Sequence, residues 1–204
     1  MPMTLDEGKA AVVLARDTLE AHVNGTRRAP AKRAPAIFKE KRGVFVTLNK
    51  EISGSTMLRG CIGYSEPVKP LGEAIRDVTV YASEDPRFPH PVLPDELDRI
   101  VVEVSVLTPP QDLATARRLD LPSKVRLGTD GLIISNLYTS GVFLPQVATE
   151  QGWDQETYIS EACSKAGLPM DAWLDEGTRV QVFQAEIFAE SKPRGEVAMV
   201  NPES

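Results

Sequence analysis

Cysteine and histidine are scarce in this chain of 204 residues, which contains two of each. Two cysteines, Cys61 and Cys163, are too few for a disulfide scaffold, so we expect a reducing, cytoplasmic setting. Together with His22 and His90 they are too scattered along the chain to form a closed structural zinc site. We therefore expect neither a bound metal nor a cofactor.

Long hydrophobic runs and an excess of basic residues are also missing. No run of eighteen apolar residues occurs, so no transmembrane helix is predicted, and Met1 to Lys9 lacks the pattern of an export signal. The net charge of -6 argues against a general nucleic-acid binder. Apolar residues form 42% of the chain, which is enough for the core of one domain or of two lobes.

The spacing of apolar residues predicts a mixture of helices and strands. Helices are expected over residues 4–23, 70–82, 145–150 and 154–166. Strands are expected over residues 43–49, 57–64, 99–108, 141–144 and 178–190. A hairpin is expected over 124–136, with an Asp-Gly turn, and a flexible tail over 191–204. Because the order lacks βαβ regularity, the fold class is α+β, with an antiparallel sheet flanked by helices.

The stretch from Met57 to Tyr64 holds the cysteine of greatest interest. Read as a strand, its side chains alternate between two faces. One face is apolar and suits the core: Leu58, Ile62 and Tyr64. The other face carries Met57, Arg59 and Cys61. Gly60 and Gly63 leave room for a backbone or a ligand to approach closely.

Two interpretations of Cys61 remain open. A cation such as Arg59 on the same face favours the thiolate, the reactive form of cysteine, so both residues are candidate catalytic groups. Alternatively, Cys61 is a buried structural residue, and Arg59 binds a carboxylate such as Glu103 or Asp85. Cys163, by contrast, falls on the apolar stripe of the 154–166 helix and is predicted to lie in the core.

Two other segments carry groups that could line a site. The proline-rich connection 83–94 contains Asp85 and Arg87, and charged loops on a rigid scaffold often carry function. The strand 99–108 places Glu103 and Ser105 on its mixed face, which suits a polar layer or a cleft.

The segment Thr26 to Arg42 has seven basic residues and one acid, Glu40. It is interpreted either as a solvated loop or as an edge that binds an anion or a partner.

The motif Leu58-Arg59-Gly60-Cys61-Ile62-Gly63 resembles the signature of the AMMECR domain family. Further matching motifs occur in the same order over roughly residues 5 to 190. They are Phe45-Val46-Thr47-Leu48, Asp85-Pro86-Arg87-Phe88-Pro89, Glu96-Leu97, Val104-Ser105-Val106-Leu107-Thr108, Gly131-Leu132-Ile133-Ile134, Leu144-Pro145-Gln146-Val147-Ala148 and Gly152-Trp153-Asp154.

The resemblance implies a single AMMECR-type domain over 1–204, with two unequal lobes and a cleft between them. Both chain ends would build the larger lobe. It implies no settled activity. Prokaryotic members of the family look like protein A of the AmmeMemoRadiSam system, whose other members are a Memo-like protein and a radical-SAM protein. The position of His90 is commonly proline in the family, so His90 is not carried over as a catalytic residue.

The expected function is therefore that of a component of a Memo- and radical-SAM-associated modification system, with no membrane partner. Its cleft would be built around Arg59 and Cys61 and lined by Asp85, Arg87, Glu103 and Ser105. The alternative is a non-enzymatic binding or regulatory module that recognises a protein or a small molecule. Fast alkylation of Cys61 at neutral pH would favour the first interpretation.

Overall fold

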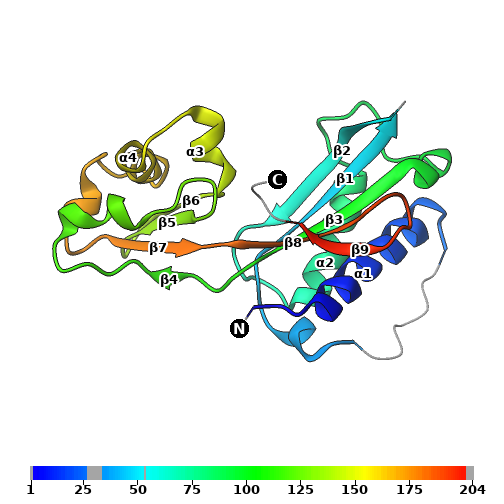
Figure 1. Ribbon diagram of the computed structural model, residues 1–204, viewed down its shortest axis with the longest axis horizontal. Helices are drawn as coiled ribbons and strands as arrows, with labels where there is room; N and C mark the ends of the chain where they lie inside the picture. Colours follow the sequence, from blue (N-terminus) through cyan, green and yellow to red (C-terminus); the bar gives the residue numbers. More distant parts are fainter. Residues whose placement is uncertain (1, 27–33, 53, 201–204) are drawn as a thin grey trace. The chain divides into compact units, whose positions relative to one another are not determined.

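The computed structural model describes residues 2–26, 34–52 and 54–200. Within them the chain forms two compact units, each with its own sheet and hydrophobic core (Figure 1). Of the described residues, unit 1 contains those up to Leu107 and again 186–200, whereas unit 2 contains Thr108–Ala185. The larger unit is thus built from both ends of the described chain. The fold is α+β with antiparallel sheets, as the sequence predicts.

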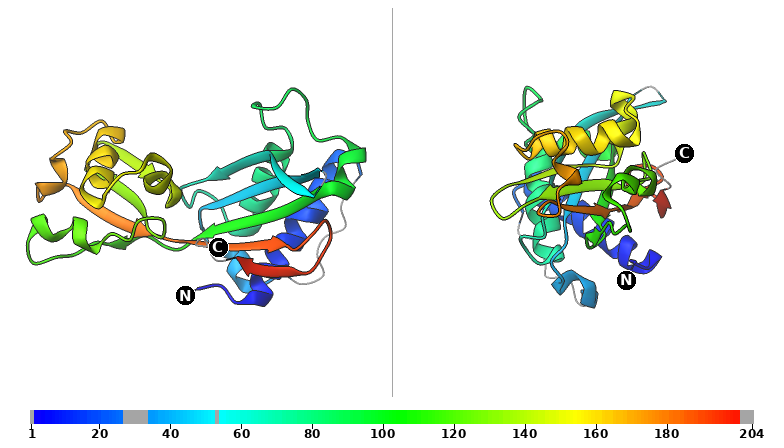
Figure 2. Two further views of the ribbon diagram at one scale, coloured as in Figure 1. Left: turned by 45° about the horizontal axis from the view of Figure 1, so that its top comes forward. Right: turned by 90° about the vertical axis from the view of Figure 1, so that its left-hand side faces the viewer.

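Unit 1 is built on a five-stranded sheet in the order β2-β1-β3-β8-β9. Its strands are β1 (Val44–Ile52), β2 (Ser55–Tyr64), β3 (Ile100–Leu107), β8 (Ala185–Glu190) and β9 (Val197–Val200). Two helices, α1 (Leu5–Val23) and α2 (Leu71–Ser83), pack on one face of the sheet (Figures 1 and 2). The short 3₁₀ helices η1 (Ala36–Lys39) and η2 (Pro94–Arg99) lie in the connections.

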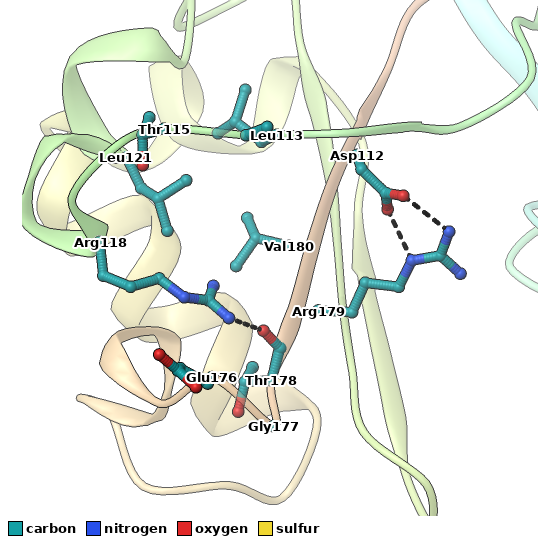
Figure 3. Close-up of a pocket in the computed structure, with 11 residues that line it drawn as sticks. Asp112, Leu113, Thr115, Arg118, Leu121, Glu176, Gly177, Thr178, Arg179 and Val180 are labelled. Atoms are coloured by element: carbon teal, nitrogen blue, oxygen red, sulfur yellow. Dashed lines mark hydrogen bonds and ion pairs between the residues drawn. The ribbon is translucent and has the colours of Figure 1, made fainter.

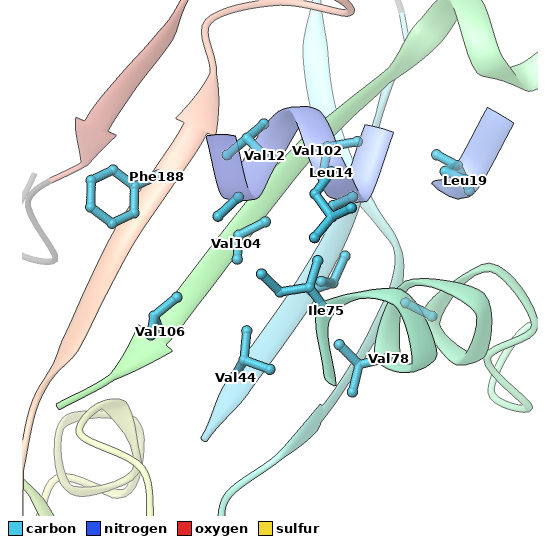
Figure 4. Close-up of a cluster of buried hydrophobic side chains, with 14 of the residues drawn as sticks. Val12, Leu14, Leu19, Val44, Ile75, Val78, Val102, Val104, Val106 and Phe188 are labelled. Atoms are coloured by element: carbon cyan, nitrogen blue, oxygen red, sulfur yellow. The ribbon is translucent and has the colours of Figure 1, made fainter. Parts of the chain in front are cut away.

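The core of unit 1 follows directly from the patterns in the sequence. Thr4 and Glu7 form the predicted capping box at the start of α1, so the first free N–H groups of the helix are satisfied. Val44, Val46 and Leu48 alternate along β1 and are fully buried against the helices. Figure 4 shows side chains from α1, α2, β1 and β3 meeting in this core.

Unit 2 is built on a four-stranded sheet in the order β4-β7-β5-β6. Its strands are β4 (Gln111–Asp112), β5 (Gly131–Ser135), β6 (Ser140–Phe143) and β7 (Arg179–Phe183). Its helices are α3 (Gln146–Gln151) and α4 (Gln155–Lys165), with η3 (Arg118–Asp120), η4 (Pro122–Lys124) and η5 (Ala172–Leu174). Asp154 caps α4 by accepting a hydrogen bond from the N–H of Thr157, and Tyr158 is the largest fully buried side chain.

The hairpin predicted over 124–136 is wrong. The chain before β5 forms η4 and a turn, in which the carboxylate of Asp130 accepts hydrogen bonds from the backbone and side chain of Arg126. Strand β5 pairs instead with β6, through a turn at residues 136–139, and with β7. Because Asp130 is already bound within its own turn, the Asp-Gly pair does not join two strands.

Two other expectations differ from the structure near the C-terminus. The single strand predicted over 178–190 is divided into β7 and β8, which belong to different sheets. Part of the segment expected to be a flexible tail forms β9, which pairs with β8, while residues 201–204 lie outside the described residues.

The basic segment Thr26 to Arg42 is described only in part, because residues 27–33 fall outside the described ranges. Arg42 is buried, and its Nη2 lies 2.9 Å from the carboxylate of Glu40. No helix within the described ranges is long and apolar enough to cross a membrane.

Candidate functional site

A β-bulge lies within the signature strand β2. Its pairing with β1 shifts register between Leu48 and Asn49, which leaves Arg59 as the extra residue. Beyond the bulge, Ile62 packs against the core of unit 1, as predicted. Leu58, on the other side of the bulge, is 45% exposed. The prediction that Leu58 faces the core is therefore wrong, because the extra residue interrupts the alternation of the strand.

The buried guanidinium of Arg59 binds the proline-rich loop and η2. Its Nε donates to Oε1 of Glu96 at 3.0 Å and its Nη2 to Oε2 at 3.1 Å. Nη2 also donates to the carbonyl oxygen of His90 at 3.0 Å, and the guanidinium carbon lies 5.4 Å from the ring centroid of Phe88. Lys50 donates to Oε1 of Glu96 at 2.7 Å. Burial raises the pKa of Glu96, but the hydrogen bonds from Arg59 and Lys50 outweigh it and lower this pKa to about 2.

These contacts correct the expected partner of Arg59. The sequence suggests Glu103 or Asp85 as the carboxylate, whereas the structure shows Glu96. The bulge accounts for the difference, because it removes Arg59 from the regular alternation that would place it beside Cys61. The role of Arg59 in this geometry is to hold the proline-rich loop against the edge of the sheet.

The same loop binds the backbone of Cys61 from the side. Asp85, which is 2% exposed, accepts a hydrogen bond from the N–H of Cys61 at 2.9 Å. Arg87 binds the carboxylate of Asp85 and also donates from Nη2 to the carbonyl oxygen of Cys61 at 2.9 Å. The hydrogen bonds from the Arg87 side chain are the main reason that the pKa of Asp85 is far below its ordinary value. Strand β2 is an edge strand, and Asp85 and Arg87 bind the N–H and the carbonyl oxygen that Cys61 directs away from the sheet.

The two glycines of the signature permit close contacts on opposite faces of β2. A Cβ atom at Gly60 would lie 2.0 Å from the carbonyl oxygen of Ala82, near the end of α2. A Cβ atom at Gly63 would lie 2.3 Å from the ring of Phe45. The room that the sequence analysis expects at Gly60 and Gly63 is thus used by a backbone and by an aromatic ring.

A row of polar side chains crosses three strands on the face of the sheet opposite α1 and α2. Thr47 on β1 is paired with Cys61 on β2 and with Glu103 on β3, so all three side chains share one face. The hydroxyl of Thr47 donates to Sγ of Cys61 at 3.3 Å. Cys61 and Glu103 are half-buried, and burial raises the pKa of Glu103. No hydrogen bond or ion pair joins Glu103 to another residue of the described ranges.

A second row lies beside the first. Phe45 on β1 is paired with Gly63 on β2 and with Ser105 on β3, so an aromatic ring and a hydroxyl flank the polar row. We call the residues Phe45, Thr47, Cys61, Glu103 and Ser105 the Cys61 face. It offers a thiol, two hydroxyls, a carboxylate and a ring within one surface of unit 1.

The residues predicted to line a site fall into two groups in the structure. Glu103 and Ser105 belong to the Cys61 face, whereas Asp85 and Arg87 contact the backbone of Cys61 and are occupied with each other. Cys163 belongs to unit 2, where it is 0% exposed and burial raises the pKa of its thiol, as expected for a core residue. Both cysteines are free. No group of three or more His, Cys, Asp or Glu residues in the described ranges could hold a metal ion.

Three residues of this site were not singled out from the sequence. Thr47 and Phe45 could have been found by applying the alternation of the strand to its second face, since Val44, Val46 and Leu48 define the buried one. Glu96 had a weaker signal in the sequence, namely its position three residues after Leu93, from which a glutamate can cap the start of a helix. In the structure its carboxylate accepts a hydrogen bond from the N–H of Leu93.

Comparison with known proteins gives consistent matches over most of the chain. The family model AMMECR1 matches residues 12–188. A protein of Methanothermobacter thermautotrophicus is 50% identical over 192 residues, which cover 93% of this chain and 97% of that protein. Protein PH0010 of Pyrococcus horikoshii is 48% identical over 193 residues, or 93% of each chain. The crystal structure of this uncharacterized protein PH0010 matches with a TM-score of 0.74 at 46% identity, covering 96% of this chain and 97% of that one.

Proposed function

The chain belongs to the AMMECR1 family, and we propose that it is a cytoplasmic subunit of a modification system that includes Memo-like and radical-SAM proteins, with Cys61 at its reaction site. The observation that carries this proposal is the row of Cys61, Thr47 and Glu103 on the Cys61 face. It combines a half-buried thiol, a hydroxyl directed at the sulfur and a carboxylate with a raised pKa. An acid with a perturbed pKa on the same surface as a nucleophile is a common feature of reaction sites, and here Thr47 stands between the two groups.

Each residue has a distinct role in the proposed chemistry. The hydroxyl of Thr47 fixes the direction of the Cys61 sulfur through its hydrogen bond. The thiol of Cys61 attacks an electrophilic carbon of the substrate, and the new S–C bond forms as the bond to the leaving group breaks and the thiol gives up its proton. Burial raises the pKa of Glu103, which makes its carboxylate a better base, so in this proposal it takes up the proton released by the thiol and passes it to the leaving group.

The remaining charged groups act as a scaffold in this proposal. Arg59 holds the proline-rich loop through Glu96 and His90, and Asp85 and Arg87 in turn hold the backbone of Cys61. Because these charges are paired with each other, they position the strand rather than take part in bond making.

A binding or regulatory module is the second candidate function. The observation that favours it is that Arg59, the cation expected to activate Cys61, is bound to Glu96 instead. In that case the Cys61 face would be a recognition surface for a small molecule or a protein, and the thiol would be one contact among several.

Labelling of the two thiols tests the accessibility that the first proposal requires. The native protein is treated with iodoacetamide at neutral pH, and the modification of Cys61 and Cys163 is followed by mass spectrometry. We expect Cys61 to react at least about tenfold faster, because Cys163 is fully buried. Equal or slower labelling of Cys61 would contradict a reactive thiol.

Replacement of the chromosomal gene for this protein by genes for its variants distinguishes the two proposed functions. We expect Cys61→Ser and Glu103→Gln to abolish the modified product of the system while the Memo-like and radical-SAM partners still co-purify. The matched control is Cys163→Ala, which removes a thiol from the other unit. Full product formation with Cys61→Ser would favour the binding module, and failure of the partners to co-purify with the unaltered protein would contradict the proposed system.

A further inference from the structure

Within the described residues, the outer edges of the two sheets are β2, β9, β4 and β6, and β2 is the longest of these strands. It has 10 residues, whereas β9 and β6 have 4 each and β4 has 2. At β4 the edge also carries charge, because Arg179 and Asp112 form a two-fold ion pair at 2.6 and 2.9 Å (Figure 3). Short length and charged side chains are two ways in which proteins prevent strands from pairing at an edge. Strand β2 is protected differently, and only over part of its length.

The protected part of β2 lies at Cys61. The N–H of Cys61 donates to Asp85 and its carbonyl oxygen accepts from Arg87, each at 2.9 Å, so both backbone groups point away from β1 and are already bound. A further strand would need the same two groups to pair with β2. The proline-rich loop therefore blocks strand pairing at this position.

The part of β2 before the bulge directs backbone groups to the same side but leaves them unbound. Cys61 lies opposite Thr47 on β1, and Leu58 lies opposite Asn49, two residues further along β1. Because backbone groups alternate in direction along β1, Leu58 directs its N–H and carbonyl oxygen away from β1, as Cys61 does. The same alternation applies to Thr56. Among the described residues, none forms a hydrogen bond with the outward backbone groups of Leu58 or Thr56.

The side chains at this part of β2 are exposed, and the larger ones are apolar. We call the residues Ser55, Thr56, Met57 and Leu58 the free edge, and all four are exposed. Met57 and Leu58 are 57% and 45% exposed and point to opposite faces of the sheet, because they are neighbours on one strand. Ile52, opposite Ser55 on β1, is 43% exposed. An edge with unbound backbone groups and exposed apolar side chains is a surface that another strand can complete.

We propose that the free edge binds an extended segment of a partner protein by strand addition. The segment forms hydrogen bonds with the outward backbone groups of Thr56 and Leu58 and continues the sheet beyond β2. One of its side chains contacts Met57 on one face of the sheet, and the next contacts Leu58 on the side of the Cys61 face. The segment therefore carries two adjacent apolar residues and no proline at the paired positions.

The position of the proline-rich loop favours another protein over a second copy as the occupant. Two copies paired through the same edge would bring the end of each β1–β2 hairpin toward the loop that is bound at Cys61 of the other copy. A short segment can end before it reaches this loop. The proposal depends on the free edge alone and does not require the reaction proposed for Cys61.

Peptide selection and hydrogen exchange test the proposal on the whole protein. The probe is a random peptide library displayed on phage, and we expect the selected peptides to share two adjacent apolar residues. A selected peptide is then synthesised, and amide exchange is followed by NMR. Exchange at Thr56 and Leu58 should slow at least about tenfold at saturation, whereas the amide of Cys61, already bonded to Asp85, should change much less. No enrichment of peptides, or unchanged exchange at both amides, would overturn the proposal.

Two substitutions at one position separate the backbone from the side chain. Thr56→Pro removes the outward N–H and leaves the bonds to β1 in place, because an edge strand accepts proline where its nitrogen faces solvent. We expect it to weaken peptide binding about tenfold or more. Thr56→Val keeps the N–H and is the matched control, which should bind like the unaltered protein. Equal affinity of the two variants would overturn the proposal, and if Thr56→Pro does not fold, the exchange measurement decides alone.

Two further measurements distinguish the occupants and the functions. Sedimentation of the unaltered protein tests for self-association. A concentration-dependent dimer that Thr56→Pro abolishes would identify a second copy as the occupant and overturn the assignment to a partner protein. Cys61→Ser should leave peptide binding unchanged while it abolishes the proposed reaction, so that failure of one proposal is distinguishable from failure of the other.

Discussion

The two units are built from the same components but place their cysteines in opposite environments. Each has an antiparallel sheet, helices and one free cysteine. In unit 1, Cys61 lies on a strand, half-buried, on the face opposite the helices. In unit 2, Cys163 lies on α4, inside the core. The comparison shows that the element and the face decide whether a thiol is available for chemistry.

Selected ion pairs of the two units allow a comparison between buried and exposed charges. Unit 1 buries Arg16 against Glu190 and Arg59 against Glu96, with Nε–oxygen distances of 2.9 and 3.0 Å. In unit 2 the pair of Arg179 and Asp112 is exposed on both sides. A buried pair cannot lose one partner without leaving a charge in a poorly solvated place, whereas an exposed charge is simply hydrated. The buried pairs should therefore matter much more for folding.

The largest expected effect contrasts these pairs. Arg59→Met leaves Glu96 buried with Lys50 as its remaining cationic partner, so we expect the free energy of unfolding of unit 1 to fall by about 3 kcal/mol. Arg179→Met, the matched change in unit 2, should cost no more than about 1 kcal/mol. Urea unfolding followed by circular dichroism measures both. Equal losses in the two variants would remove the distinction between the units.

The next effect contrasts the two cysteines. Cys163→Ser introduces a hydroxyl into the core of unit 2, and we expect a loss of about 1–3 kcal/mol if that hydroxyl remains unpaired. Cys61→Ser should cost less than about 1 kcal/mol, because the half-buried hydroxyl can be hydrated. Melting curves of the two variants provide the measurement. A melting curve unchanged by Cys163→Ser would count against its structural role.

A smaller effect concerns pH and Glu96. Its folded pKa of about 2 is below the unfolded value of about 4.3, so its ionised form contributes stability above the unfolded pKa. That contribution is lost as the pH falls through the folded pKa. The stability difference between the unaltered protein and Arg59→Met should therefore shrink between about pH 5 and pH 2. A difference that is independent of pH over this range would show that Glu96 is not the cause.

The smallest effect has the opposite sign and concerns Glu103. Burial raises the folded pKa of Glu103, so its protonated form contributes to the stability of the fold below the unfolded pKa. This contribution is lost as the pH rises through the folded pKa. We expect Glu103→Gln to gain stability relative to the unaltered protein as the pH rises. Glu156→Gln, at an exposed position in the first turn of α4, is the control. A relative loss of stability at high pH would mean that Glu103 has a favourable partner in solution.

Local patterns predicted much of this structure. The capping box of Thr4 and Glu7, the buried face of Val44, Val46 and Leu48, and the core position of Cys163 each depend on neighbours within a few residues. Predictions failed where a residue of a local motif forms a different interaction in the folded chain. The Asp-Gly pair at residues 130–131 resembles a hairpin turn, but Asp130 is bound by Arg126 within its own turn.

The sequence by itself determined the α+β class, the ends of the main helices and the importance of the signature strand, because periodicity and capping act over one or two turns of chain. Only the tertiary structure decided which groups meet. Arg59 and Glu96 are 37 residues apart, and the bulge that directs one toward the other arises from the pairing of β1 with β2. Likewise, Cys61 and Glu103 share a face only because both strands pair with Thr47 between them. Such contacts depend on strand register, which the alternation of one strand alone does not specify.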